Sequence, residues 1–447
     1  MRFVVPHALG PLNGTLRVPG DKSLSHRVVL FAALAEGTSR ITGVLDSADV
    51  RSTVSAVRAL GAVVEQRGRD RTGLTLEIHG WGTRGPVTPA RPINCGNSGT
   101  TARLLLGVLA GWPVQATLIG DESLSNRPMG RVTTPLEMMG ARFDTSSGHL
   151  PLSIEGGRLR AIEYDSPVAS AQVKTALLLA GLRAEGRTLV REPSPSRDHT
   201  ERLLPAFGVA VGRDADSCAA WVDGPAVPHG FDFAVPADPS SAAFVTVAAL
   251  VNRGSHVLLP EVALNPTRVG FLRVLERMGA EVEVTVSLVA PDRAGGDEPF
   301  GSLAVWGTSS LTSTTITPDE VPSLIDEVPI LSLAATQATG TTRFEGVGEL
   351  RVKESDRLSA LAEGLTALGA HVTAGEDWLD VTGPTAIRAA TLESLGDHRL
   401  AMTWIVAGLI AEGPVVVGGS DAVGVSYPAF VEDLTGLFGA DGDTACQ

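Results

Sequence analysis

Lysine and cysteine are both scarce in this chain of 447 residues. Cysteine occurs only at positions 95, 218 and 446, which are far apart. Three separated cysteines predict neither a disulfide framework nor a metal site. Lysine occurs only as Lys22, Lys174 and Lys353, so arginine supplies nearly all of the 36 basic residues. A position that keeps lysine against this bias is therefore a candidate for a role that arginine cannot fill.

Long apolar runs and excess positive charge are also lacking. A membrane helix needs about 20 apolar residues, and the strongest run, residues 400–411, is shorter. The opening residues MRFVVPHALGP lack the continuous apolar segment of a signal peptide. The formal net charge of −14 disfavours nucleic acid and anionic membranes as partners, because both usually need a basic face. We expect a soluble, cytoplasmic protein that acts on small molecules and, by default, a monomer.

A short pattern repeats six times along the chain. Each copy is a helix-like apolar stretch that ends at a glycine and leads into a β-rich run. The glycines are Gly61, Gly140, Gly208, Gly279, Gly369 and Gly439. The pattern predicts helices that close at a left-handed glycine and continue directly into a strand. The spacing of about 70 to 90 residues exceeds that of solenoid repeats and suits a βαβαββ unit.

The repeats divide the chain into two similar halves. The length and the hydrophobic content of 43% predict a large core and two or three domains. Three copies precede the segment FDFAVPADPSSAAF and three follow it, and its part rich in Pro, Asp and Ser is typical of a domain boundary. We expect an α/β protein with an N-terminal domain over residues 19–235 and a C-terminal domain from residue 236 to 447.

Basic and small residues recur at predicted helix starts in the first half. PGDKSLSHRVVLFAAL places Lys22 and Arg27 around a turn before an apolar helix, which Ser23 or Ser25 could cap. NCGNSGTTARLLLGVLAG repeats this arrangement around Gly99. Free N–H groups at a helix start bind anions, and nearby cations strengthen the site. The first motif lacks the glycines of a P-loop, so it does not predict ATP binding.

Three more segments of the first half bring polar residues to turns or helix starts. They are GDESLSNRPMGRV with Arg127, VASAQVKTALLLAGL with Ser170, Gln172 and Lys174, and SPSRDHTERLL with Ser196 and Arg197. Taken singly, each residue could be a helix cap, a solvated turn residue or, for Lys174, part of a helix surface. Taken together, they predict a site for a substrate that carries several negative charges.

The second half contributes charged residues at two helix starts. SLIDEVPILSLAA places Asp326 and Glu327 directly ahead of an apolar helix, which either could cap. DHRLAMTWIVAGLIA adds Arg399 just before another apolar stretch. A single acid would be enough for capping. The second acid of the pair is therefore a candidate for chemistry.

The segment RVKESDRLSALAEGL combines both charges. If its helix begins near Ser355, then Lys353, Glu354 and Arg357 share the entrance of the helix. Glu354 would then titrate under the influence of two cations. An exposed ladder of ion pairs is the alternative interpretation.

Nine motifs, in this order along nearly the whole chain, resemble the EPSP synthase family of enolpyruvyl transferases. They are PGDKSLSHR, GNSGTTAR, RPMGRV, ASAQVKTALLLAGL, SRDHTERLL, DPSSAAF, IDEVPIL, RVKESDRL and DHRLAMT. The resemblance implies an inside-out α/β barrel fold, in which two domains of three βαβαββ units each are joined by a hinge and close around substrate. It also places residues 1–18 with the C-terminal domain.

The resemblance further implies a reaction of the shikimate pathway of aromatic amino-acid biosynthesis. The enolpyruvyl group of phosphoenolpyruvate (PEP) is transferred to the 5-hydroxyl of shikimate 3-phosphate. The reaction releases phosphate and proceeds by addition and elimination through a tetrahedral intermediate. No metal and no organic cofactor is implied.

The resemblance also implies roles for individual residues. Those expected at shikimate 3-phosphate are Lys22, Ser23, Arg27, Ser170, Ala171, Gln172, Ser196, Arg197, Asp326 and Lys353. Those expected at PEP are Lys22, Asn97, Gly99, Arg127, Gln172, Arg357 and Arg399. Asp326 is the expected base for the attacking hydroxyl, and Glu354 is the expected proton donor and acceptor at the methylene carbon. Lys22 is the third expected catalytic residue.

Two positions distinguish this chain within the resemblance. Val425 stands where some members have a lysine, so one cation of the PEP site is either absent or supplied by another arginine. Arg197 and Ala171 are typical of a branch that often has alanine in the glycine-rich loop, but this chain keeps Gly99. The glycine predicts room for the inhibitor glyphosate, and therefore sensitivity to it.

Three alternatives stay open at the level of sequence. The first is the sister enolpyruvyl transferase that acts on UDP-N-acetylglucosamine, although DESLSNRPMG lacks the cysteine usual in its mobile loop. The second is a paralogue of specialised metabolism that uses another hydroxylated carboxylate. The third is a catalytically silent ligand-binding relative.

Overall fold

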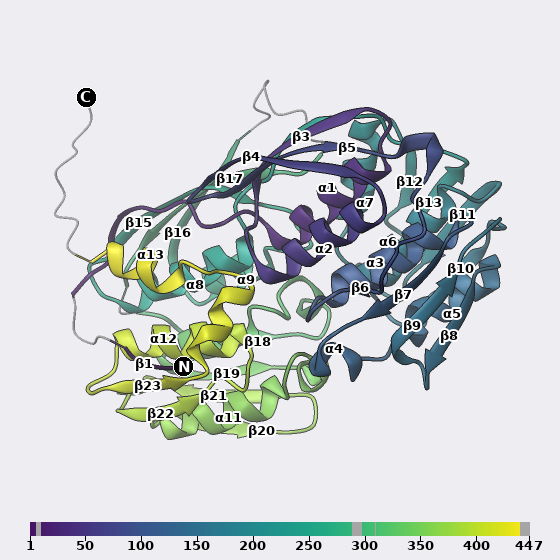
Figure 1. Cartoon of the computed structure of the whole chain (residues 1–447). Helices are drawn as coiled ribbons and strands as arrows, with labels where there is room; N and C mark the ends of the chain where they lie inside the picture. Colours follow the sequence, from purple (N-terminus) through teal and green to yellow (C-terminus); the bar gives the residue numbers. More distant parts are fainter. Residues whose placement is uncertain (6–9, 288–296, 309, 439–447) are drawn as a thin grey trace. The chain divides into compact units, whose positions relative to one another are not determined.

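The computed structural model describes residues 1–5, 10–287, 297–308 and 310–438, and the chain forms two compact units (Figure 1). One unit comprises the described residues of Met1–Pro19, Pro236–Leu288 and Pro299–Gln447. The other comprises Gly20–Val235 with Asp297 and Glu298. We call them the first-and-last unit and the middle unit, respectively. Each has a hydrophobic core of its own.

The middle unit contains two complete βαβαββ repeats. One runs through β6 (Ile93–Asn94), α3 (Gly99–Ala110), β7 (Gln115–Ile119), α5 (Gly130–Met139), β8 (Arg142–Ser146) and β9 (His149–Glu155). The other runs through β10 (Glu163–Asp165), α6 (Ala171–Gly181), β11 (Gly186–Arg191), α7 (His199–Leu203), β12 (Val211–Asp214) and β13 (Ala219–Gly224). In both sheets the first two strands pair in parallel and the other neighbours pair antiparallel. The first sheet has the order β6-β7-β9-β8, and its strands are labelled in Figure 1.

The third sheet of the middle unit is completed by a strand from the end of that unit. It contains β3 (Thr38–Val44), β4 (Val63–Asp70), β5 (Gly73–His79) and β14 (Asp232–Ala234) in the order β14-β3-β5-β4. Because β14 pairs in parallel with β3, the arrangement is the same βαβαββ repeat with its first strand supplied last. The helices of this repeat are α1 (Lys22–Leu34) and α2 (Ala48–Ala59).

The first-and-last unit repeats the architecture and begins with the N-terminal residues. One sheet has the order β18-β19-β21-β20, with β18 (Thr315–Ile316), α10 (Val328–Thr336), β19 (Gly340–Phe344), α11 (Arg357–Ala367), β20 (His371–Ala374) and β21 (Leu379–Gly383). A second has the order β16-β17-β15-β2, with β2 (Asn13–Thr15), α8 (Pro239–Val251), β15 (His256–Ala263), α9 (Gly270–Arg277), β16 (Glu281–Ser287) and β17 (Phe300–Trp306).

The last repeat forms a three-stranded sheet in the described part of the chain. It comprises β22 (Ala390–Glu393), α12 (His398–Leu409), β23 (Val415–Gly418), α13 (Phe430–Gly436) and, antiparallel to β23, β1 (Arg2–Val5). Strands β1 and β2 thus tie the N-terminal segment into this unit. The expected fold class, with repeated βαβαββ units in two similar domains, is confirmed.

Glycines close the repeated helices as the sequence predicts. Gly61, Gly140, Gly208, Gly279 and Gly369 have φ angles between +79° and +118°. In this region a side chain would strain the backbone, so glycine ends the helix and lets the chain turn into the next strand. The sixth glycine, Gly439, lies outside the described residues.

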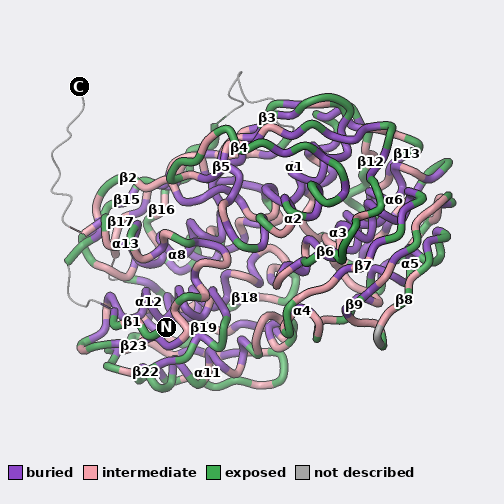
Figure 2. Tube along the Cα trace, in the orientation of Figure 1, coloured by how far each residue is buried: buried purple, intermediate pink, exposed green. Residues whose placement is uncertain are grey.

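The helices that begin near the predicted site are deeply buried. Buried positions, purple in Figure 2, run along most of α1, α3 and α6. The backbones of α3 and α6 approach closely, because a Cβ added to Gly107 would lie 2.2 Å from the carbonyl oxygen of Ala176. The described residues contain no helix long and apolar enough to cross a membrane.

Hydrogen bonds between side chains fix the starts of three helices to one another. His26 Nδ1 lies 2.7 Å from Thr53 Oγ1, and Thr53 Oγ1 lies 2.6 Å from Thr101 Oγ1. The Thr101 hydroxyl in turn donates to Ser98 Oγ at 2.7 Å. Burial lowers the pKa of His26 to about 3, so its ring is neutral at pH 7 and acts here as a structural link. This series of hydrogen bonds links α1, α2 and α3 to one another.

Candidate active site

Helix α1 begins at Lys22, earlier than a cap at Ser23 or Ser25 would place its first residue. Asp21, rather than Ser23 or Ser25, is the N-cap, and its carboxylate accepts a hydrogen bond from the backbone N–H of Leu24 at 2.7 Å. The Ser25 hydroxyl instead accepts from the backbone N–H of Leu45 at 2.9 Å. Because Asp21 caps the helix, the expectation of a serine cap is wrong. Lys22 becomes the first helical residue.

The Lys22 ammonium is paired with a carboxylate from the next helix. Lys22 Nζ lies 2.5 Å from Asp49 Oδ2 in the first turn of α2, and the lysine side chain is 23% exposed. The ammonium is therefore held in place and yet remains accessible. The sequence analysis missed Asp49, because nothing local to residue 22 indicates a partner in another helix.

Arg27 is a buried cation with neutral hydrogen-bond partners. Its side chain donates to Thr200 Oγ1 at 3.0 Å, to Thr175 Oγ1 at 3.1 Å and to the backbone oxygen of Ser23 at 3.1 Å. Burial lowers the pKa of Arg27 to about 10, so the guanidinium stays charged at neutral pH. These hydrogen-bond partners carry no charge, while the carboxylates of Glu201, Asp21 and Glu298 act electrostatically on the guanidinium. Nearby, Arg197 Nη1 donates to Ser23 Oγ at 3.4 Å.

The glycine-rich motif is surrounded by arginine side chains. Ser98 caps α3, which begins at Gly99. Arg127 Nη2 donates to Asn97 Oδ1 at 2.9 Å and to Ser123 Oγ at 3.2 Å. A Cβ added to Gly99 would lie 3.5 Å from Arg127 Nη1. The structure therefore brings Asn97, Gly99 and Arg127 together as the sequence predicts.

Arg103 belongs to the same place and was missed by the sequence analysis. Its Nη1 donates to Gln172 Oε1 at 2.7 Å, and Gln172 Nε2 donates to Thr100 Oγ1 at 3.0 Å. Burial, followed by the charge of Arg127, lowers the pKa of Arg103 to about 10. A signal was available, because Arg103 lies four residues after Gly99 and so on the same face of α3.

The two serines expected at a phosphate share one carboxylate. Ser170 caps α6, whose first residue is Ala171. Ser170 N donates to Glu192 Oε1 at 2.6 Å, and Ser196 Oγ donates to Glu192 Oε2 at 2.7 Å. Lys174 is buried beneath them, 5% exposed, so the alternative of a helix-surface lysine is wrong.

The residues described so far form one cluster, in the middle unit. A second cluster lies in the first-and-last unit, around Arg357. Helix α11 begins at Arg357 itself, and its cap is Asp356, so it starts two residues later than expected. Arg357 Nε donates to Asp397 Oδ2 at 2.6 Å, Nη1 donates to Asp326 Oδ1 at 3.4 Å, and Nη2 donates to Glu354 Oε2. Burial would lower the pKa of Arg357, but these carboxylates raise it above its usual value.

Asp326 and Glu327 do not cap α10. Glu327 occupies the cap position without a capping hydrogen bond from its side chain, and its carboxylate accepts from Ser240 Oγ instead. Arg399 lies 3.4 Å from Asp326 Oδ2 and 3.6 Å from Glu327 Oε1. The expectation of capping is wrong, because ionic partners take both carboxylates. Burial raises the pKa of Glu327.

Lys353 and Glu354 have different partners although they are adjacent. Lys353 Nζ lies 2.5 Å from Glu349 Oε1, one turn earlier, and its side chain is 21% exposed. This pair matches the exposed ion-pair alternative. Glu354 instead contacts the buried Arg357, as the functional interpretation predicts.

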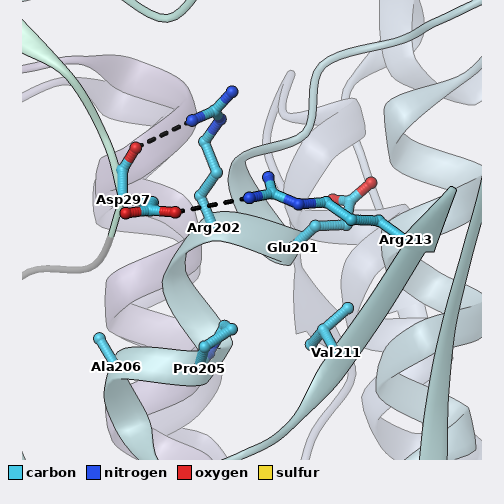
Figure 3. Close-up of a pocket in the computed structure, with 7 residues that line it drawn as sticks. All are labelled: Glu201, Arg202, Pro205, Ala206, Val211, Arg213 and Asp297. Carbon is cyan, nitrogen blue, oxygen red and sulfur yellow. Dashed lines mark hydrogen bonds and ion pairs between the residues drawn. The ribbon is translucent and has the colours of Figure 1, made fainter. Parts of the chain in front are cut away.

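A surface pocket of the middle unit includes Glu201, which also pairs with the buried Lys174. Figure 3 shows its lining residues, which are Glu201, Arg202, Pro205, Ala206, Val211, Arg213 and Asp297. Its arginines are engaged by acids or carbonyls, since Arg202 Nη1 donates to the backbone oxygen of Asp297 at 2.9 Å and Arg213 Nη2 to Asp297 Oδ2 at 3.4 Å. None of the predicted site residues lines it, so we do not place substrate there.

The fold and the two clusters define a class of protein. Two units of repeated βαβαββ modules, with arginine, lysine and serine gathered at helix starts, are what the resemblance to enolpyruvyl transferases predicts. Across the described residues, no group of three or more His, Cys, Asp or Glu side chains could hold a metal ion.

Comparisons with known proteins agree with this class. The sequence model of the family described as EPSP synthase (3-phosphoshikimate 1-carboxyvinyltransferase) matches residues 6–434. The 3-phosphoshikimate 1-carboxyvinyltransferase of Halorhodospira halophila is 49% identical over 96% of this chain and 94% of its own length. That of Oceanobacillus iheyensis is 45% identical over 96% and 97%. The solved EPSP synthase of Acinetobacter baumannii is 40% identical, with a TM-score of 0.87 and 98% of both chains covered.

The chain therefore belongs to the EPSP synthase family. It is a transferase of the shikimate pathway of aromatic amino-acid biosynthesis.

Proposed function

We propose that the chain transfers the enolpyruvyl group of PEP to the 5-hydroxyl of shikimate 3-phosphate and that the predicted residues carry out this reaction. The observation that carries the proposal is that Asp326 and Glu354, from separate segments, both contact the buried Arg357. Such a cluster brings two carboxyl groups, a candidate base and a candidate proton donor, to one shared cation.

The middle unit supplies residues suited to shikimate 3-phosphate. Arg27 and Ser23 would bind the carboxylate, and Arg27 is suited because its described hydrogen-bond partners are neutral. The phosphate would be bound by Ser170, Ser196 and Arg197, and the ring would lie against Gln172. Ala171 is the first residue of α6 and offers a backbone N–H at the start of that helix.

Arginines from both units are assigned to PEP. Arg127 and the backbone around Gly99 would bind it together with Gln172 and Lys22. Arg357 and Arg399 would supply charge from the other cluster, and Lys353 would assist at the hydroxylated substrate. Planar guanidinium groups suit this task, because they bind carboxylate and phosphate through two parallel hydrogen bonds.

The chemistry requires one base and one proton donor. Asp326 would accept the proton of the attacking hydroxyl, while Glu354 would protonate the methylene carbon of PEP and later remove a proton from it. Arg357 and Arg399 face four carboxyl groups, from Asp326, Glu327, Glu354 and Asp397. Lys22 would stabilise the phosphate that leaves.

The reaction is tested by measuring phosphate release. We expect release from PEP with shikimate 3-phosphate and none from PEP with UDP-N-acetylglucosamine. Release with the UDP-sugar alone would favour the sister transferase. No release with either substrate would contradict the proposal and favour a paralogue or a silent relative.

Replacing Gly99 by alanine is expected to weaken inhibition by glyphosate. The added Cβ would lie 3.0 Å from Arg103 Nη1 and 3.5 Å from Arg127 Nη1, so it occupies space beside two cations assigned to the anion site. We expect the parent to be sensitive to glyphosate. In the Gly99→Ala variant the inhibition constant should rise by about tenfold or more, which corresponds to the loss of about 1.4 kcal/mol of binding free energy.

The control for this prediction is Gly157→Ala, since a Cβ at Gly157 meets nothing within 4 Å. Inhibition should be unchanged in that variant. A Gly99→Ala enzyme as sensitive as the parent would contradict the expected role of Gly99.

A cytoplasmic location and a monomeric state stay expectations of the sequence, and size-exclusion chromatography with light scattering tests the latter.

A further inference from the structure

Glu192 is a buried carboxylate at the place where two phosphate-binding serines meet. It follows directly after β11 and is 6% exposed. Its Oε1 accepts from Ser170 N at 2.6 Å, and its Oε2 accepts from Ser196 Oγ at 2.7 Å. One side chain thus joins two separate backbone segments.

The two serines have no shared secondary structure to align them. Ser170 is the cap of α6, whereas Ser196 lies in the connection between β11 and α7. The Ser170 hydroxyl accepts from the N–H of Val173 at 3.4 Å, which leaves its hydrogen available to a ligand. The Glu192 carboxylate is a hydrogen-bond partner that both segments share.

A buried carboxylate beside a phosphate site requires compensation, because unpaired charge is costly to bury and repels the ligand. Lys174 provides it, since its Nζ lies 2.8 Å from Glu192 Oε2 and 2.8 Å from Glu201 Oε1. Burial alone would lower the pKa of Lys174, but the two carboxylates raise it. The lysine therefore stays charged, and its charge is directed toward the carboxylates.

We propose that Glu192 is a positioning residue for the phosphate of the hydroxylated substrate: it sets Ser170 and Ser196 at the spacing that the phosphate requires, and Lys174 is its buried ionic partner. The inference rests on the proposed function. A phosphate dianion has only acceptor oxygens, so Ser196 must turn its hydrogen from Glu192 to the ligand on binding. The carboxylate remains satisfied during this change, because Lys174 and Ser170 N still donate to it.

Glu192→Gln separates positioning from simple electrostatics, because the two effects have opposite signs. Removal of a negative charge near the phosphate would by itself tighten binding. Loss of positioning weakens binding. The new amide NH₂ is a donor and must face another donor, either Lys174 Nζ or Ser170 N, so the segment between β11 and α7 is no longer held at the same place. We expect the dissociation constant of shikimate 3-phosphate to rise about tenfold, and that of shikimate to stay within about twofold, in calorimetric titrations.

Glu201→Gln is the matched control. Glu201 is 5% exposed and binds the same lysine at the same distance, but its described hydrogen bonds do not include either serine. We expect it to lower the melting temperature without changing the preference for shikimate 3-phosphate over shikimate. Equal losses of preference in both variants would assign the effect to the buried lysine and overturn the positioning role.

Glu192→Asp keeps the test decisive if the glutamine variant does not fold. The shorter carboxylate can still pair with Lys174 but cannot reach both serines, so the preference should again fall. A preference unchanged or increased in folded variants at position 192 would overturn this inference alone. If the parent chain had no preference for the phosphorylated substrate, the proposed function would be overturned, and this inference with it.

Discussion

Glu354→Gln is expected to reduce kcat by two to four orders of magnitude, the range typical of a lost general acid or base. The amide keeps the shape of the side chain and can still accept a hydrogen bond from Arg357, but it cannot exchange a proton with the methylene carbon of PEP. Because Arg357 also binds Asp397 and Asp326, the buried guanidinium stays paired and the chain should fold. Phosphate release under saturating substrates measures the effect.

A suitable control for Glu354 is Glu345→Gln. Glu345 also pairs with an arginine, since Arg343 Nε lies 2.9 Å from its Oε1, but it is 40% exposed and lies outside the Arg357 cluster. Its kcat should match that of the parent. A Glu354→Gln enzyme with kcat within about threefold of the parent would assign proton transfer to another group.

Lys22→Arg is expected to lower kcat/KM by about a hundredfold, the effect of misplacing a reacting group by roughly 1 Å. The compact ammonium is held by Asp49, and a guanidinium bound to the same carboxylate would extend farther into the space assigned to substrate. Arginine also cannot release a proton, so any exchange at this position would be lost. Steady-state kinetics with each substrate varied in turn measure the change.

The control for Lys22 is Arg187→Lys, at an exposed pair in which Arg187 Nε lies 2.9 Å from Asp223 Oδ1. We expect no change in kinetics there, because surface ion pairs contribute little. If Lys22→Arg retained most of the parent's turnover, the scarcity of lysine would have no functional explanation at this position.

Helix boundaries could have been predicted better than they were. Asp21 and Asp356 each cap a helix at the position just before a basic residue of the predicted site, and Asp397 caps a helix two residues before Arg399. Aspartate is a strong N-cap, and the following residue is then placed in the first turn of the helix. The apolar pattern marks the buried face of a helix more reliably than its first residue.

The partners of the charged residues could not be predicted from local sequence. Lys22 contacts Asp49, Arg103 contacts Gln172, and Arg357 contacts Asp397. Each pair joins residues that lie far apart along the chain. Spacing rules act over one or two turns of a helix, so they carry no information about such contacts.

The sequence by itself determined the class of fold and the family, because glycines that end helices and motifs at helix starts are local features; the roles of the site residues stay predictions. The tertiary structure alone decided which charge faces which. Lys174 shows the difference: its sequence setting suggested a helix surface, yet packing buries it between Glu192 and Glu201. Charge pairing in a core depends on which segments meet there, and that is a property of the folded chain.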